Sequence, residues 1–248
     1  MLLYGFHSVS SRLKRAPGSV EELYVDGARQ DARMRELIAL AEQSGVQPHV
    51  VDAVRLDRIA PQRRHQGVAA FASAAIAQVD LDELLDRLDA PPLLLVLDGV
   101  TDPRNLGACL RAADGAGAHA VIAPKDRAAT LNEAAIQTAS GAAESVPYIT
   151  VTNLARTLRE LRDRGIWLVG TADDADVGLH DARLPQSVAL VLGAEGQGMR
   201  RLTREHCDLL VRIPMAGQVA SLNVAVAAGV VLYEAVRQRH GSQASAAP

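Results

Sequence analysis

Residues 93–124 read LLLVLDGVTDPRNLGACLRAADGAGAHAVIAP, which is an apolar run, a helical stretch and a second apolar run. Neither apolar run alternates with polar residues, so each predicted strand is expected to be covered on both faces. Buried strands that are separated by helices are typical of a parallel sheet between helical layers. This stretch therefore predicts an α/β domain.

The same order continues along the chain. Further strands are predicted at VPYITV (146–151), IWLVGTA (166–172), VALVLG (188–193) and LLVRIP (209–214). A long helix is predicted from about Ser221 to Arg239, with Ser221 as its N-cap and Asn223 in its first turn. This helix is apolar on every side and rich in small residues, which predicts that it is fully buried.

The first 72 residues repeat this order on a smaller scale. Strands are predicted at 2–4, 22–27, 49–53 and 67–72, with helices after His7 and from Asp31 to Gln43. We therefore predict a small α/β domain at 1–72 and a larger domain at 93–240. Residues 73–92 are the predicted linker, with a short helix capped by Asp80, and residues 241–248 are predicted to be disordered.

Composition narrows the class of protein. The chain has 248 residues, of which 48% are apolar, and this is ample for a buried core. Its two cysteines are far apart and its histidines show no ligand spacing, so we expect no metal. The longest apolar run, from Val224, is too short for a membrane span, and the first residues do not read as a secretion signal. We expect a cytoplasmic protein without a membrane partner.

Charge differs between the two predicted domains. Residues 1–72 hold ten Lys and Arg against eight Asp and Glu, whereas the remainder holds 16 against 21. The front part is the better candidate for contact with a polyanion, and the loop PQRRHQG (61–67) gathers Arg63, Arg64 and His65. A solvated loop is an equally good interpretation of these three residues. Only 3% of residues are aromatic, so contact with RNA would depend on phosphate, sugar and shape.

The glycine-rich stretch LVLGAEGQGM (190–199) contains a carboxylate, Glu195, and no lysine. A phosphate-binding loop presents positive potential, and a glutamate there would oppose the ligand. The spacing of the glycines also fits neither the dinucleotide nor the P-loop pattern, and no G-x-G-x-x-G follows the strand at Leu93, which disfavours a nicotinamide-dependent dehydrogenase. The stretch predicts a neutral or cationic ligand.

The segment TDPRNLGACLRAADG (101–115) carries candidates for chemistry. Asn105 is a plausible N-cap for a helix that presents Arg111, although an arginine at such a position is more often a solvated surface group. Cys109 has apolar neighbours and no visible base, which favours a core residue over a nucleophile. Ser221 lacks a G-x-S-x-G elbow, so acyl transfer is disfavoured.

Three segments together resemble the signature motifs of the SpoU-type RNA ribose 2′-O-methyltransferases, within the SPOUT class. They are DPRNLGACLRAA (102–113), LVLGAEGQGM (190–199) and IPMAGQVASLNVAVAAGVVLYE (213–234). YGFHSV (4–9) and HQG (65–67) resemble the small substrate-binding domain of the branch that methylates a guanosine in the peptidyl-transferase loop of bacterial 23S ribosomal RNA. The resemblance implies an S-adenosylmethionine cofactor, a homodimer, and a parallel-sheet domain with a C-terminal trefoil knot.

The resemblance also assigns roles to residues. It implies that the cofactor is bound, largely through backbone groups, by Gly193, Ala194, Gly198, Ile213, Met215 and Leu222. The motif residues of the catalytic site map onto Asn105, Arg111, Glu195, Ser221 and Asn223. A guanidinium is a poor proton acceptor, so we expect Arg111 to hold the target phosphate and stabilise the developing alkoxide, with a role as base left open. Glu195 would orient Arg111 or the ribose, and Asn105 would position the substrate.

The sequence also leaves open the exact target nucleotide and the class of substrate. The chain could methylate transfer RNA instead, or could be a non-catalytic RNA-binding member of the same fold. The acceptor could be naked 23S ribosomal RNA or a precursor particle. With the resemblance, the loop 61–67 becomes the first choice for contact with the RNA backbone.

Overall fold

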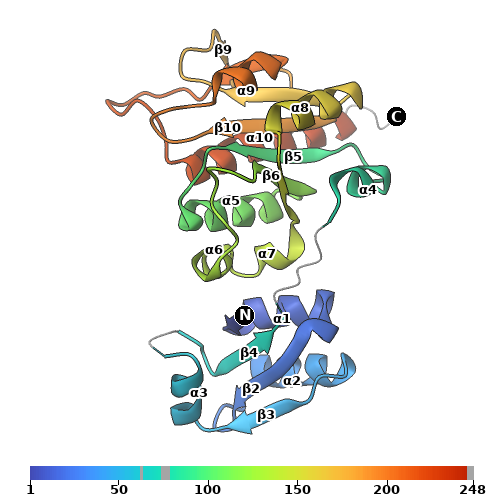
Figure 1. Ribbon diagram of the computed structural model, residues 1–248, viewed down its shortest axis with the longest axis vertical. Coiled ribbons are helices and arrows are strands. Elements are labelled where there is room, and N and C mark those ends of the chain that lie inside the picture. Colours follow the sequence, from blue (N-terminus) through green and yellow to red (C-terminus); the bar gives the residue numbers. More distant parts are fainter. Residues whose placement is uncertain (62–63, 74–78, 245–248) are drawn as a thin grey trace.

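The structure is a computed structural model that describes residues 1–61, 64–73 and 79–244. Two separate sheets form, one from strands within residues 2–72 and one from strands within residues 93–212, and Figure 1 shows them as two bodies in which helix α1 of the first faces helix α7 of the second. Each sheet is made of strands from one of the two groups that the sequence predicts, within residues 1–72 and within residues 93–240.

The N-terminal body is a four-stranded sheet with strand order β1-β4-β2-β3. Its β2 and β3 are parallel, whereas β4 runs antiparallel to both β1 and β2. Its strands are β1 (Leu2–Tyr4), β2 (Val20–Asp26), β3 (Pro48–Val51) and β4 (Val68–Ala72), and its helices are α1 (Phe6–Arg15), the single 3-10 turn η1 (Pro17–Ser19), α2 (Ala32–Gln43) and α3 (Ala53–Ile59). Helix α3 was not predicted. Helix α2 begins as predicted, because the Asp31 side chain accepts a hydrogen bond from the Met34 N–H.

The C-terminal body is a seven-stranded sheet with strand order β7-β6-β5-β10-β8-β11-β9, and all of its neighbouring strands are parallel. The strands are β5 (Leu93–Asp98), β6 (Ala120–Pro124), β7 (Tyr148–Val151), β8 (Trp167–Thr171), β9 (Val177–Gly178), β10 (Val188–Gly193) and β11 (Leu209–Arg212). The predicted parallel sheet is confirmed, and the two-residue β9 is the strand that the sequence did not reveal.

Helices cover both faces of this sheet. They are α4 (Leu81–Asp86), α5 (Pro103–Gly115), α6 (Glu133–Ala139), α7 (Ala142–Ser145), α8 (Leu154–Asp163), α9 (Arg201–His206) and α10 (Val224–Ala244). Along β5, Leu93, Leu95 and Leu97 pack in the core beside α5 and α10, whereas Leu94 and Val96 pack in the core beside α8. Burial on both faces explains why these strands have no polar alternation.

Two predicted helix starts are wrong. Helix α5 is capped by Asp102, whose carboxylate accepts from the Arg104 N–H at 2.8 Å, so Asn105 lies in the first turn instead. Helix α10 begins at Val224, which leaves Ser221 outside it. The Asn223 side chain accepts from the Ala225 N–H at 3.0 Å and so acts where Ser221 was expected. In both cases the chain offers two capping side chains within four residues, Asp102 and Asn105 or Ser221 and Asn223, and the spacing alone did not select between them.

Two expectations about α10 need correction. The helix runs to Ala244 and thus enters the segment that was predicted to be disordered from residue 241, while residues 245–248 lie outside the described residues. It is also not buried on every side, because Val226 is 53% and Tyr233 is 54% exposed. Among the helices that the structure describes, none is long and apolar enough to cross a membrane.

Candidate functional site

The candidate site lies at the carboxyl end of β10, where the glycine-rich loop begins. Ala194 and Gly198 face each other across the loop, with N–H to C=O distances of 3.1 Å and 2.8 Å between their backbones. Gly196 and Gly198 have positive φ angles of 74° and 67°, a conformation that favours glycine. A Cβ on Gly193 would lie 2.0 Å from the carbonyl carbon of Gly198, so the loop can fold back only over a glycine.

A cavity of about 330 Å³ lies between this loop and the segment that leads into α10. All six residues that were predicted to bind a cofactor line it: Gly193, Ala194, Gly198, Ile213, Met215 and Leu222. Sequence reasoning missed a further wall, made by Thr171, Ala172, Asp173, Met199 and Arg204. Part of it follows β8, which neighbours β10 in the sheet. The carboxyl ends of neighbouring parallel strands meet at the same edge of a sheet. Knowledge that β8 lies beside β10 would therefore have predicted that the residues after β8 line the cavity.

The chemistry of the cavity suits S-adenosylmethionine. Apolar side chains such as Leu192, Met199 and Ile213 offer a surface for a flat aromatic ring, and the backbone of the loop offers polar groups. Asp173 and Glu195 are acidic, and no lysine is found among the described residues that line the cavity. The basic lining residue Arg204 is held by Asp174, with N···O at 2.9 Å. This balance of charge favours a cationic ligand over a phosphate.

Three of the predicted catalytic residues come together beside the cavity. Oε1 of Glu195 accepts hydrogen bonds from Asn223 Nδ2, from the Val224 N–H at 3.0 Å and from Asn105 Nδ2 at 3.5 Å. Asn223 Nδ2 also donates to Asn105 Oδ1 at 3.0 Å. The first turn of α5, the glycine-rich loop and the start of α10 therefore share one polar cluster, made by Asn105, Glu195 and Asn223. Ser221 lies nearby, exposed, in the wall of the cavity.

Arg111 lies elsewhere in the single chain. It follows Asn105 by six residues on α5, which corresponds to about 9 Å along the axis and about 240° around it. Its exposed side chain lines a second cavity, of about 740 Å³, that is shared with α1 and α2 of the N-terminal body. Within one chain, therefore, the predicted contact in which Glu195 orients Arg111 is replaced by contacts of Glu195 with Asn105, Asn223 and Val224.

Asp98 is a residue behind the site, next to the end of the glycine-rich loop, that sequence reasoning missed. Its buried carboxylate, at the end of β5, accepts from the Arg200 N–H at 2.8 Å, and the Arg200 guanidinium lies 3.5 Å away. This contact fixes the far end of the glycine-rich loop, while Glu195 fixes its middle. A single aspartate that ends a wholly apolar strand was the available signal.

The described cysteines are unsuited to nucleophilic chemistry. Burial, and then the charge of Glu195, raise the pKa of the Cys109 thiol to about 12. Burial likewise raises the pKa of Cys207 to about 12. Thiolates are the reactive form, so burial disfavours the reactive state of both side chains at neutral pH. Cys109 is fully buried, in agreement with its prediction as a core residue.

The loop that was predicted to contact RNA is described in part. Arg63 lies outside the described residues, and Arg64 is exposed. His65 is held in place, because its Nε2 lies 3.0 Å from Asp57 Oδ1 and its Nδ1 accepts from the Gly67 N–H at 3.0 Å. His65 therefore shapes the loop, which leaves Arg64 as the better candidate for a phosphate contact.

Comparison with known proteins identifies relatives for both bodies. The sequence profile of the SpoU rRNA Methylase family matches residues 92–233. A second profile, described as RNA 2'-O ribose methyltransferase substrate binding, matches residues 2–76. The two profiles fall on the two sheets.

Individual proteins agree with these profiles over nearly the whole chain. The 23S rRNA (guanosine-2'-O-)-methyltransferase RlmB of Ralstonia nicotianae is 61% identical and covers 96% of this chain and 96% of its own length. The protein of the same name from Escherichia coli is 53% identical, over 96% of this chain and 98% of its own. A crystal structure of the SpoU methyltransferase AviRb from Streptomyces viridochromogenes with AdoMet is 29% identical, with a TM-score of 0.79, and covers 97% of this chain and 91% of that one.

Proposed function

The chain belongs to the SpoU rRNA methylase family, and from this premise we propose that it transfers a methyl group from S-adenosylmethionine to the ribose 2′-hydroxyl of a guanosine in 23S ribosomal RNA. One observation within the fold carries the proposal. Asn105, Glu195 and Asn223, from three separate motif segments, form a hydrogen-bonded cluster beside the cavity whose wall contains Gly193, Glu195 and Leu222.

The residues of the cavity explain how the cofactor would be held. The folded loop from Gly193 to Gly198 presents backbone groups, and Ile213, Met215 and Leu222 present apolar surface. When bound, the cofactor supplies an electrophilic methyl group on a sulfonium. Asp173 and Glu195 make the cavity favourable for positive charge.

The ribose hydroxyl needs help, because it is a weak nucleophile at neutral pH. Arg111 is our candidate for this role, through charge stabilisation of the developing alkoxide and contact with the target phosphate. Asn105 and Asn223 would orient the ribose, since their amides lie beside the Glu195 carboxylate at the cavity. Ser221, exposed in the cavity wall, is placed to contact the substrate or the cofactor.

We assign RNA binding to the N-terminal body, whose family profile is named for substrate binding. Arg64 supplies an exposed positive charge, and nearby Arg29 and Arg33 stack over the Phe6 ring at 4.7 Å and 4.8 Å. The acceptor is 23S ribosomal RNA or its precursor particle. Because this substrate is made and assembled in the bacterial cytoplasm, we expect the protein to act there.

We also propose that the protein acts as a homodimer. Val226 and Tyr233 expose apolar surface on α10, although other apolar residues of this helix, such as Val231 and Leu232, pack in the core. An exposed apolar patch on a helix that also contributes to the core is typical of a subunit interface. A second copy would also explain why Arg111 of one chain lies away from its own Glu195, if the partner completes the site.

The decisive experiment maps ribose methylation in ribosomal and transfer RNA from a strain that lacks this protein. We expect loss of one 2′-O-methylguanosine in 23S ribosomal RNA and its return when the wild-type gene is restored. The same RNA, with the purified protein and labelled cofactor, should regain the methyl group at that position. Loss of a transfer-RNA modification instead would move the activity to the other substrate class, and unchanged methylation of every RNA would contradict the proposal.

A further inference from the structure

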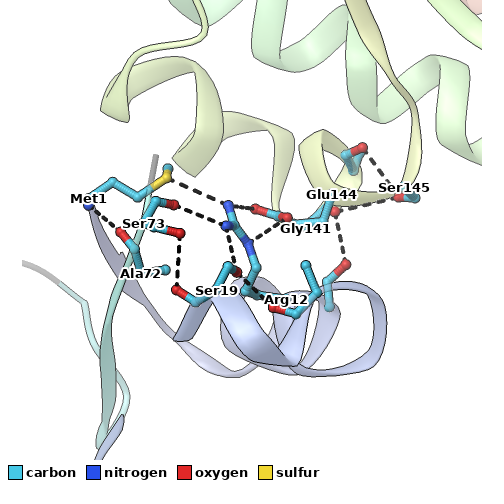
Figure 2. Close-up of polar contacts among 11 residues, drawn as sticks. Met1, Arg12, Ser19, Ala72, Ser73, Gly141, Glu144 and Ser145 are labelled. Carbon is cyan, nitrogen blue, oxygen red and sulfur yellow. Dashed lines mark hydrogen bonds and ion pairs between the residues drawn. The ribbon is translucent and has the colours of Figure 1, made fainter. Parts of the chain in front are cut away.

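The two bodies are joined by an ion pair that is hidden from solvent. Arg12, on α1, and Glu144, on α7, have side chains that are 0% and 5% exposed. Arg12 Nη2 donates to Glu144 Oε1 at 2.7 Å, and Arg12 Nε lies 2.7 Å from Oε2 in ion-pair contact. Figure 2 shows this pair at the centre of a network of polar contacts between the bodies.

Arg12 also contacts residues at both ends of the N-terminal body. Its Nη1 donates to the Ser19 hydroxyl at 3.1 Å and to the Ser73 carbonyl at 3.3 Å, and its Nη2 lies 3.6 Å from the Met1 sulfur (Figure 2). Ser73 is the last residue of this body that the structure describes. One guanidinium therefore contacts the start of the chain, the end of this body and the neighbouring body.

A second contact shows that the two bodies approach closely. Ser11 donates to the Gly141 carbonyl at 3.2 Å. Gly141 has a φ of 96°, and a Cβ at this position would lie 3.2 Å from the His7 carbonyl oxygen. The backbone of α1 thus approaches the start of α7 at a glycine, which has no side chain to block it. A small rotation of one body would disturb both the hydrogen bond of Ser11 and the ion pair of Arg12.

Burial of a charged pair is a costly way to hold two bodies together. Apolar side chains of similar volume often stabilise such a contact equally well or better, because they avoid the loss of hydration. A paired guanidinium and carboxylate, by contrast, satisfy each other in few relative orientations. Compared with an apolar contact, the pair of Arg12 and Glu144 therefore restricts the relative orientation of the two bodies more strongly.

We propose that Arg12 and Glu144 are positioning residues that fix the RNA-binding body at one orientation to the methyltransferase body. The inference rests on the proposed function. Its consequence for the reaction lies in the cavity of about 740 Å³ beside the pair. One wall carries Lys14 and Arg33 from the N-terminal body, and the other carries Arg111 from α5. The pair therefore sets the position of these basic residues of the N-terminal body relative to the candidate catalytic arginine.

The test compares three versions of the full-length protein. Arg12→Met with Glu144→Leu replaces the ion pair by an apolar pair. The matched control, Arg156→Met with Glu160→Leu, removes an exposed ion pair on α8, with side chains 71% and 50% exposed. For each version we would measure cofactor affinity, affinity for 23S ribosomal RNA from a strain that lacks the protein, single-turnover methylation at saturating RNA, and small-angle X-ray scattering.

We expect the variant of the buried pair to keep its cofactor and RNA affinities within about threefold. Its methylation rate should fall by about 10- to 100-fold, because small misplacement of reacting groups has effects of this size. Its scattering should show a larger radius of gyration, and the control should match the wild type. Separation of rate from affinity is the signature of positioning, since loss of folding would reduce all three measurements together.

Several results would overturn the inference. A methylation rate within about twofold of the wild type would do so, as would a slow variant with unchanged scattering. Loss of cofactor affinity would show that the pair stabilises the fold and does not position it. If the wild-type protein methylates no ribosomal RNA, the proposed function fails, and the scattering comparison still decides whether the pair fixes the orientation.

Discussion

The carboxylate of Glu195 accepts a hydrogen bond from the backbone N–H of Val224 at 3.0 Å, and so joins the glycine-rich loop to the first residue of α10. The first N–H groups of a helix have no partner within the helix, and a negative charge beside them is favourable. The same oxygen accepts from Asn223 Nδ2. Glu195 is therefore a structural link between the two segments that line the cofactor cavity.

This link predicts different effects for two substitutions at one position. Glu195→Ala leaves the Val224 N–H without its acceptor, and we expect cofactor affinity to fall by about 10- to 100-fold. Glu195→Gln keeps an oxygen that can accept, so its affinity should lie between those of Ala and the wild type. Calorimetric titration with S-adenosylmethionine measures both, with Glu205→Gln on α9 as control. Equal affinities for Ala and the wild type would show that the link has no part in cofactor binding.

The sequence alone predicts the catalytic body well, because burial on both faces leaves a strong signal. Strands such as β5 and β10 are apolar at every position, and this pattern has few structural explanations. The short β9 and α3 lack such a signal, since a two-residue strand such as Val177–Gly178 depends on its neighbour for definition.

The candidate site was predictable where it followed motifs and unpredictable where it depended on tertiary contacts. Gly193, Ile213 and Leu222 come together as expected. The caps were misassigned because Asp102 and Asn223 compete with neighbouring side chains of similar capping ability. Neither the burial of Asp98 nor the distance of Arg111 from Glu195 could be read from spacing, because both depend on how strands and helices pack.

The loop of the N-terminal body yields a prediction about salt. If Arg64 contacts a phosphate, Arg64→Ala should weaken RNA binding and reduce the slope of log K against log salt concentration by about 0.7 to 0.9. Filter binding over a range of potassium chloride concentrations measures the slope. Arg162→Ala, an exposed arginine on α8, is the matched control and should leave the slope unchanged. Parallel slopes for Arg64→Ala and the wild type would move the RNA contact to another surface.

The exposed side of α10 yields a prediction about assembly. Tyr233→Arg places a charge on the apolar patch that includes Val226, and burial of an unpaired charge in an interface is unfavourable. We expect the wild type to sediment as a dimer and this variant to shift toward monomer with loss of methylation. Trp167→Arg, at another exposed apolar position, is the control. A wild type that is active as a monomer would contradict the proposed homodimer.

Glu234, also on α10, predicts how stability depends on pH. The hydrogen bond from Arg237, followed by those from Gln238 and His180, lowers the pKa of this carboxyl from 4.5 to about 2. Because the folded pKa is below the unfolded one, the stabilisation is complete above about pH 5 and is lost as pH falls toward 2. We expect Glu234→Gln to lower the free energy of unfolding by about 1–2 kcal/mol at pH 7, because solvent screens the charge of the exposed Arg237 partner.

Urea denaturation at pH 7 and pH 3 measures this difference. The wild type and Glu234→Gln should converge as the carboxyl becomes protonated. A difference in stability that is the same at both pH values would show that the effect comes from packing or from loss of neutral hydrogen bonds. Glu160→Gln on the exposed face of α8 controls for the general effect of removing a carboxylate.

Arg111 provides the test of the chemistry, because its place on α5, away from the cavity that holds Gly193 and Leu222, separates two kinds of function. If Arg111 acts on the ribose, Arg111→Ala should leave cofactor affinity nearly unchanged and lower turnover by about 100-fold or more, as when an interaction of the transition state is removed. Arg104→Ala, an exposed residue of the same helix, is the control.

Arg111→Lys keeps the charge without the planar fork and loses its proton more readily, so activity that returns at raised pH would support proton transfer. Inactivity of Lys across the pH range would favour bidentate positioning and charge stabilisation. Near-normal turnover of Arg111→Ala would show that Arg111 is a surface residue, and the site would then depend on Glu195 and Asn223.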